Sequence, residues 1–182
     1  MDTCCIDMTN KAELREAINS MFQWYQHAGT CLAYLGDIPP RSGELSTSRW
    51  FTRGWTRQEL IAPYNMVFLA SDWTCITSEI TSPSLLSRIT GVPTSLLLGE
   101  ELHHVSMAMR ISWAAGRLNT KVEDKAYCFL GMFNIHVPLY EERQSCAFRR
   151  LQQELTKDSD DQSIFARTTC GSQVAQREYA AE

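Results

Sequence analysis

The chain contains two short apolar runs that decide its fold, Cys31-Leu32-Ala33-Tyr34-Leu35 and Met66-Val67-Phe68-Leu69-Ala70. Each is too short for a helix and is bounded by turn residues, which is typical of a buried strand. Between them, residues 50–61 have a helical pattern that Pro63 stops. A helix between two strands that are buried on both faces predicts a βαβ crossover and a parallel sheet.

Upstream of the first run, residues 11–26 predict an amphipathic helix. Its apolar positions recur at helical spacing: Leu14, Ala17, Ile18, Met21, Phe22 and Tyr25. Asn10 with Glu13 three residues later forms a capping-box pattern. The residues before it, Cys4-Cys5-Ile6 ended by Asp7, indicate the last part of another buried strand. We expect the helix to cover one face of the sheet.

Downstream of the second run the pattern becomes mostly helical. Residues 83–89 and 93–98 have Pro near the start and Gly past the end, as short helices do. Further helices are predicted over residues 104–116, over residues 120–131 from a Thr120–Glu123 capping box, and over residues 145–157. The predicted organisation is an α/β part (residues 1–73), a mostly α-helical segment (residues 74–168) and a polar tail (residues 169–182).

Composition and charge exclude several classes of protein. The 182 residues carry 17 basic and 21 acidic side chains, so no basic field attracts nucleic acid. No apolar run approaches the roughly 20 residues that span a bilayer, and the N-terminus does not resemble a secretory signal. The seven cysteines are scattered without a CxxC pair, which favours reduced, buried thiols, Cys5 among them, over disulfides or a metal site. We therefore expect a cytoplasmic protein without a membrane span.

Two motifs are similar to the second and third blocks of the fungal heterokaryon-incompatibility (HET) domain. They are Asp2-x-x-Cys5-Ile6-Asp7 and Arg53-Gly54-Trp55-Thr56-Arg57-Gln58-Glu59-Leu60. Residues 110–115, 122–128 and 160–166 resemble the helical segment that often follows this domain in vegetative incompatibility proteins. The resemblance covers roughly residues 1–166, with several motifs in the family's order.

The chain departs from the family pattern at three places. The family's first block, an apolar strand with a Ser-His-x-Trp-like end, normally lies upstream of the point where this chain starts. Val137-Pro138-Leu139-Tyr140 runs into Glu141 instead of the usual Gly-Glu pair, and Arg167 replaces a Trp. HET domains are similar to TIR domains, so the resemblance implies a doubly wound parallel sheet of order 2-1-3-4-5 that lacks its first strand. The missing strand predicts an open sheet edge through which copies of the chain associate.

The TIR resemblance also implies a site. In many TIR proteins a Glu one helical turn after a Trp cleaves NAD, and Trp55-x-x-x-Glu59 has this spacing. Glu59 would be the catalytic carboxylate that stabilises the oxocarbenium-like charge as nicotinamide leaves. Asp2, Asp7 and Trp55 would bind the ligand. NAD would then be a substrate, with no other cofactor implied, and Glu59 is expected near Asp7 or Asp37 at the carboxyl ends of the strands.

A plainer interpretation of each residue stays open. Glu59 is more simply explained as a solvated carboxylate or as a partner of Arg53 or Arg57. Trp55 is more simply explained as a core anchor, and Asp7 is equally explained as a helix cap. The pair His103–His104 is explained as solvated or capping.

Three hypotheses of function follow. The first is an effector-type signalling module of fungal heterokaryon (vegetative) incompatibility, which triggers programmed cell death on non-self recognition. The second is a TIR-like NAD glycohydrolase that uses Glu59. The third is an inactive fragment or decoy. We expect protein partners or self-association through the sheet edge, and no NAD cleavage by this chain because part of the pocket is absent.

Overall fold

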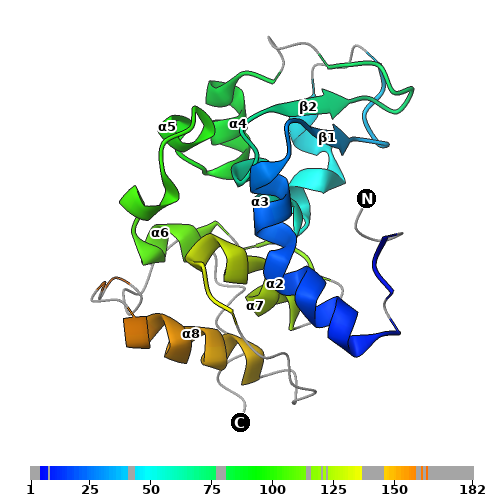
Figure 1. Cartoon of the computed structure of the whole chain (residues 1–182). Helices are drawn as coiled ribbons and strands as arrows, with labels where there is room; N and C mark the ends of the chain where they lie inside the picture. The colour runs from blue at the N-terminus through cyan, green and yellow to red at the C-terminus, as the bar shows by residue number, and fades with distance from the viewer. Residues whose placement is uncertain are drawn as a thin grey trace.

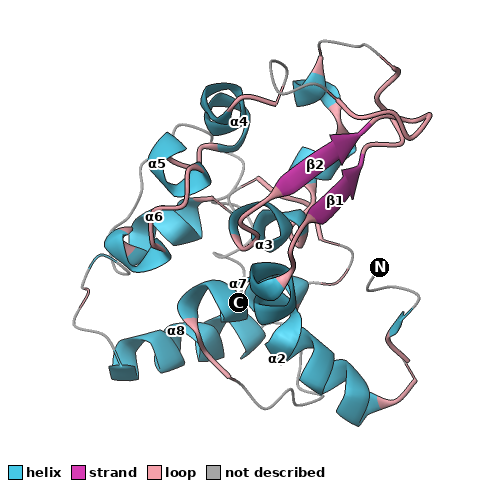
Figure 2. Ribbon diagram, turned by 45° about the horizontal axis from the view of Figure 1, so that its top comes forward, coloured by secondary structure: helices cyan, strands magenta, loops and turns pink. Residues whose placement is uncertain are grey.

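The protein is described by a computed structural model that covers residues 5–7, 9–40, 44–76, 81–113, 116–119, 121, 123–136, 146–158, 161 and 163. A small sheet with α4 and α5 forms one half, and α2, α7 and α8 form the other, with α3 between them (Figures 1 and 2). The elements in chain order are α2 (Lys11–His27), β1 (Cys31–Tyr34), η1 (Leu45–Thr47), η2 (Arg49–Thr52), α3 (Thr56–Ile61), β2 (Met66–Leu69), α4 (Pro83–Thr90), α5 (Thr94–Leu97), η3 (Leu102–His104), α6 (Met107–Ser112), α7 (Asp124–Leu130), η4 (Gly131–Phe133) and α8 (Cys146–Asp158).

The described sheet is the predicted βαβ unit. Strands β1 and β2 pair in parallel, with Cys31 opposite Met66 and Tyr34 opposite Leu69, and α3 lies in the crossover between them. On β1 only the inner face is buried, because Leu32 and Tyr34 alternate with buried Cys31 and Ala33 and are exposed. The prediction that both faces are buried is therefore wrong for β1.

The residues just before α2 do not form the predicted strand. Cys5 is exposed and Ile6 half-buried, and neither lies in a strand; Cys4 and Asp2 lie outside the described residues. The reason is local, since Asp7 and Glu13 already hold the chain in the turn that leads into α2. The backbone N–H of Asp7 donates to the Glu13 carboxylate (3.0 Å).

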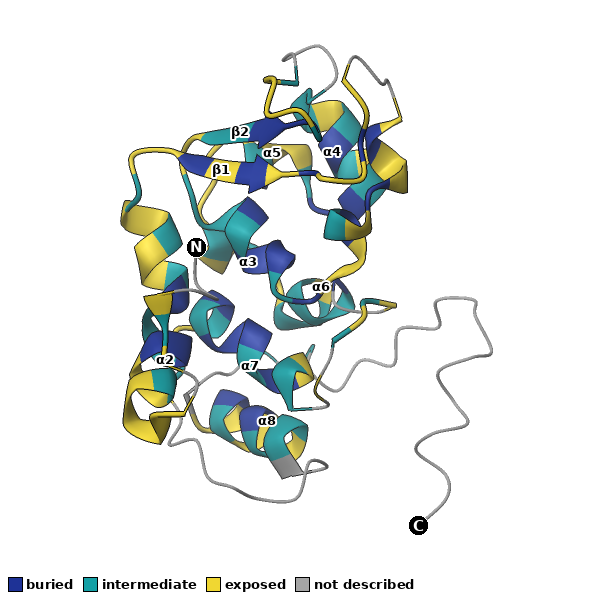
Figure 3. Ribbon diagram, turned by 90° about the vertical axis from the view of Figure 1, so that its right-hand side faces the viewer, coloured by how far each residue is buried: buried dark blue, intermediate teal, exposed yellow. Residues whose placement is uncertain are grey.

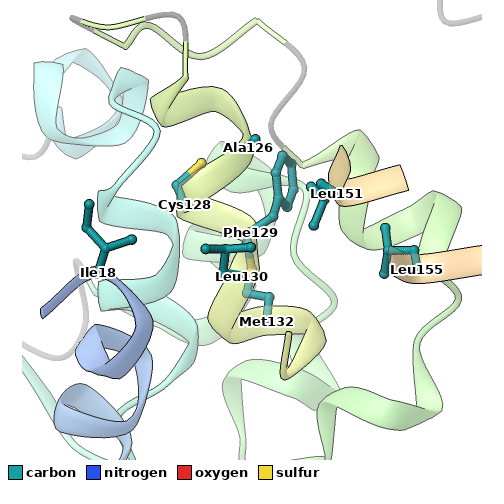
Figure 4. Packing of buried hydrophobic residues seen from close by; sticks show 8 residues of the cluster. All are labelled: Ile18, Ala126, Cys128, Phe129, Leu130, Met132, Leu151 and Leu155. Carbon is teal, nitrogen blue, oxygen red and sulfur yellow. The ribbon is translucent and has the colours of Figure 1, made fainter. Parts of the chain in front are cut away.

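Helix α2 begins where the sequence predicts, but it covers a different surface. The Asn10 side chain accepts from the backbone N–H groups of Ala12 and Glu13, so the N-cap prediction is confirmed. The buried face of α2 does not cover the sheet. Ile18 instead joins a cluster with residues of α7, η4 and α8, which we call the lower core (Figure 4): Ile18, Ala126, Cys128, Phe129, Leu130, Met132, Leu151 and Leu155.

A second cluster, the sheet core, lies under the inner face of the strands. Its buried members are Ala33, Leu35, Ile38, Leu45, Phe51, Leu60, Phe68 and Leu86. Because Leu60 belongs to the sheet core and half-buried Trp55 and Ile61 pack on the lower core, α3 touches both. Figure 3 shows α3 and α7 as the buried middle of the molecule, while the outer flank of α2 is exposed.

The helix predicted over residues 50–61 is broken in two. Between η2 and α3 the backbone of Arg53 is extended and forms an isolated β-bridge with Leu118. The Gly54 N–H donates to the Leu118 carbonyl (3.1 Å). A Cβ on residue 54 would overlap the Asn119 side chain, so glycine is required for this approach. A contact 64 residues away therefore overrides the local helical pattern.

Several downstream predictions are confirmed. Helix α4 has Ser82 as N-cap and ends at Gly91, which adopts the left-handed region (φ 72°) that favours glycine. Helix α8 matches the prediction within one residue, whereas α6 is much shorter than residues 104–116 and α7 starts at Asp124, with Thr120 outside the described residues. No helix in the described ranges is long and apolar enough to cross a membrane.

Candidate functional site

Trp55 lies at the start of α3 and is half-buried. It packs against the lower core, and its side chain donates a hydrogen bond to the carboxylate of Asp124 on α7. Burial raises the pKa of Asp124, although the Trp55 hydrogen bond and the charge of Lys121 oppose the shift. Trp55 is thus an anchor between α3 and α7, which is the plainer of its two interpretations.

Glu59 is half-buried one turn further along α3. Burial first, and the charge of Glu59 second, raise the pKa of the Cys31 thiol at the start of β1. Asp37 follows the carboxyl end of the same strand, where it accepts from the Ser48 hydroxyl (2.8 Å) and the Arg49 N–H (2.7 Å). The expectation that Glu59 lies by Asp7 or Asp37, at the carboxyl ends of the strands, stays a prediction.

Asp7 is exposed in the turn before α2 and bonds within that turn. Its carboxylate accepts from the N–H (2.8 Å) and the hydroxyl (2.6 Å) of Thr9, and these bonds hold the pKa of Asp7 below its usual value. Asp7 therefore serves the turn before α2, and its predicted role in binding a ligand stays a prediction within the described residues. Asp2 lies outside them.

Arg57 links α3 to two other helices, and the sequence analysis did not single it out. Its side chain is almost fully buried, at 4% exposed. Nη1 donates to the carbonyl of Thr90 (2.7 Å), the last residue of α4, and Nη2 donates to the carbonyl of Trp113, the C-cap of α6. Helix C-termini carry partial negative charge, so two of them stabilise a buried cation without a carboxylate. Burial, helped by the charge of Arg117, lowers the pKa of Arg57 to about 9.

Arg117 locks the start of α3 from the other side. Its Nη1 donates to the Arg53 carbonyl (2.7 Å) and to the Thr56 hydroxyl (3.2 Å), and burial lowers its pKa to about 10. Five polar side-chain atoms in the described structure are buried without a hydrogen-bond partner: Arg57 Nε, Gln58 Nε2, Trp113 Nε1, Asn119 Oδ1 and Glu123 Oε2. The sequence carried one signal for these buried polar side chains: Arg57 and Gln58 lie within residues 53–60, the block that resembles the HET domain.

A cavity of about 350 Å³ lies elsewhere, between α2, η3, α6 and η4. Its lining contains amides, imidazoles and the guanidinium of Arg110, but no acidic side chain and none of the predicted site residues. Arg110 is held by the carbonyls of Val105 (2.8 Å) and Met132 (3.1 Å), with its guanidinium 5.4 Å from the Phe133 ring centroid. Its bonds fix α6 against η4.

Among the residues that the structure describes, the thiols and imidazoles do not form a reactive group. Of the four cysteines whose state is described, Cys31 and Cys128 are buried while Cys5 and Cys75 are exposed, and all four are free. The burial predicted for Cys5 is thus wrong, whereas burial raises the pKa of Cys128 to about 12. His103 and His104 are exposed beside Glu101 and Glu100. Within the described ranges, no three His, Cys, Asp or Glu side chains gather as a metal site would require.

No family model and no solved structure matches the chain. The chain is similar to Vegetative incompatibility protein HET-E-1 of Podospora anserina, with 39% identity over 169 residues. The alignment covers 87% of this chain and 12% of that protein, so the chain spans a small part of the length of this relative. Identity at this level over most of the chain shows that it is related to a fungal vegetative incompatibility protein.

Proposed function

We propose that the chain is part of an effector-type signalling module of fungal heterokaryon incompatibility, whose output is programmed cell death after contact with non-self. The observation that carries this proposal is the similarity to HET-E-1 over 87% of the chain. The HET-domain assignment, which rests on the blocks at residues 2–7 and 53–60, belongs to the same proposal. A cytoplasmic location and a TIR-like sheet are further parts of it.

The arrangement around α3 supports a role for block 53–60 in holding the module together. Gly54 admits Asn119, Trp55 bonds Asp124, and Arg57 joins the ends of α4 and α6. These side chains connect the crossover helix of the sheet to the helical segment. The block thus explains how the α/β part and the helical part act as one unit.

NAD cleavage by Glu59, with Asp2, Asp7 and Trp55 at the ligand, is the weaker hypothesis. Its support is the spacing of Trp55 and Glu59, whereas Trp55 packs against the lower core and bonds Asp124. The crevice expected for a nucleotide lies at the carboxyl ends of the strands. We therefore propose that the chain signals through protein partners. If the expression test below shows no effect on growth, the third hypothesis, an inactive fragment or decoy, is favoured.

Inducible expression in a fungal cell tests the proposal. The encoded protein, with whatever sequence precedes residue 1, is expected to arrest growth. A Glu59→Gln variant that arrests growth equally supports signalling without NAD cleavage, whereas a harmless Glu59→Gln variant supports the enzyme hypothesis. If the wild-type protein accumulates and growth is unaffected while HET-E-1 arrests the same strain, the effector proposal is wrong.

A further inference from the structure

Within the part of the chain that the structure describes, the hydrogen-bond pattern of the sheet leaves one edge of β1 open. Cys31 donates its N–H to the Asn65 carbonyl (2.9 Å), and Leu35 donates to the Leu69 carbonyl (2.8 Å). In a parallel ladder alternate residues of a strand bond to the same neighbour. The N–H and C=O groups of Leu32 and Tyr34 therefore point away from β2.

The opposite edge of the sheet is paired. The Phe68 carbonyl accepts from the Ile76 N–H (2.8 Å), and the Ala70 N–H donates to the Thr74 carbonyl (2.9 Å). Residues 74–76 thus cover the outer edge of β2. Among the residues that the structure describes, the backbone hydrogen bonds recorded for β1 all join it to β2.

Apolar side chains stand beside the open edge. Leu32 is 65% exposed and Tyr34 is 42% exposed, both on the outer face of β1. Tyr34 stacks on Trp73, with ring centroids 4.4 Å apart, and its hydroxyl donates to the Ser71 carbonyl (3.0 Å). Trp73 adopts a φ of 67°, a region that a bulky residue rarely occupies. Trp73 is itself 62% exposed, so it adds apolar surface beside Tyr34.

The strand lacks the features that normally prevent edge pairing. Proteins protect an open edge with Lys, Pro, a bulge or an inward charge. The sequence of β1 is Cys31-Leu32-Ala33-Tyr34, with no charged residue and no Pro. Unpaired backbone groups next to exposed apolar side chains are what a further strand requires.

We propose that the occupant of this edge is β1 of a second copy of the chain, antiparallel, with the twofold axis passing at Ala33. In this register Leu32 lies opposite Tyr34 of the second copy, and Tyr34 opposite its Leu32. Both are pairs that exchange two N–H···O=C bonds, so the four outward groups of each β1 are satisfied. Each pair also sets Leu against Tyr on the same face of the sheet.

Self-complementarity is the reason for choosing a second copy. The backbone N–H and C=O groups of β1 that point outward belong to Leu32 and Tyr34, and Ala33 lies midway between these two residues. Two copies of β1 can therefore pair in antiparallel orientation about Ala33 without a register shift. Because the strand is uncharged, no like charges meet across the axis. The inference deepens the proposed signalling through protein partners and rests on it only for its biological meaning.

Hydrogen exchange on the full chain tests the register. As the protein concentration rises, the apparent mass is expected to double, and the amides of Leu32 and Tyr34 are expected to become protected. The amides of Cys31, Ala33 and Leu35 bond β2 and should be protected at every concentration. A chain that stays monomeric, or one that dimerises while the Leu32 and Tyr34 amides exchange freely, overturns the inference.

A charge at the edge provides the matched variant. Leu32→Lys is expected to weaken self-association at least tenfold, since its side chain is exposed in the monomer and the fold should be unaffected. Leu98→Lys is the control, because Leu98 is equally exposed (70%) but follows α5. The proposal is contradicted if the Leu32→Lys variant self-associates as strongly as wild type. It is also contradicted if a strand of another protein occupies the edge. If the chain forms dimers but its expression does not arrest growth, only the proposed function is refuted. If expression arrests growth while the protein stays monomeric, only this inference is refuted.

Discussion

Arg57 donates a hydrogen bond from Nη2 to the backbone carbonyl of Trp113, and its guanidinium carbon lies 6.0 Å from the centroid of that residue's indole ring. The two residues are 56 positions apart and belong to different halves of the chain. The same guanidinium bonds the carbonyl of Thr90. One side chain of the crossover helix thus joins the ends of two downstream helices.

Loss of this link should destabilise the whole chain. Arg57→Met retains the length of the side chain but leaves the carbonyls of Thr90 and Trp113 buried without a donor. We expect the free energy of unfolding to fall by about 2–4 kcal/mol, measured by urea denaturation. Arg88→Met, on the exposed face of α4, is the control and should change it by less than about 0.5 kcal/mol. Equal stability of the two variants would contradict the role of Arg57.

Gly54 should tolerate no side chain. A Cβ at this position overlaps the Asn119 amide, so Gly54→Ala is expected to cost about 1–3 kcal/mol through overpacking. Gly29→Ala is the matched control, because a Cβ there meets no atom within 4 Å. If Asn119 is the cause, the double variant Gly54→Ala/Asn119→Gly should recover part of the loss. No recovery would show that another contact is responsible.

Asp124 should make the stability of the protein depend on pH. Its pKa is raised by burial, so the folded state binds the proton more tightly than the unfolded state does. The charged carboxylate therefore costs stability above the folded pKa, and this cost disappears as pH falls through that value. Asp124→Asn, which keeps an oxygen for Trp55, should be more stable than wild type at pH 7. Thermal melts should show this advantage shrinking on acidification, whereas a constant difference would exclude the ionisation as its source.

The purified chain should not cleave NAD. Trp55 packs against the lower core and bonds Asp124, and Asp7 bonds within its own turn, so both are engaged in contacts of the fold rather than at a ligand. We expect no nicotinamide release above background by chromatography, in wild type and in Glu59→Gln alike. Turnover by wild type that is lost in Glu59→Gln would restore the enzyme hypothesis.

Elements with strong local signals were predictable. Helix α2 starts at the predicted Asn10 cap, α4 stops at the predicted Gly91, and both strands lie within one residue of their predicted limits. In each case a cap, a Pro–Gly pair or an apolar run acts over a few residues. Such signals do not depend on what the element packs against.

The candidate site was less predictable, because its residues are placed by distant partners. The i, i+4 spacing of Trp55 and Glu59 gave no information on Asp124, the carboxylate that Trp55 bonds. Arg57 carried no pattern that distinguishes a buried guanidinium from an exposed one. Its burial depends on the carbonyls of Thr90 and Trp113, which only the folded chain brings together.

By itself, the sequence determined that strands and helices alternate in the first part of this protein and that helices dominate after it, since hydrophobic spacing and end signals are local. Tertiary structure alone decided that α2 packs on α7 and η4 rather than on the sheet, that the crossover helix breaks at Gly54, and that among the described residues the backbone of β1 bonds only β2. These outcomes depend on which surfaces meet, and the free energy of burying one surface against another is a property of both partners and not of either segment alone.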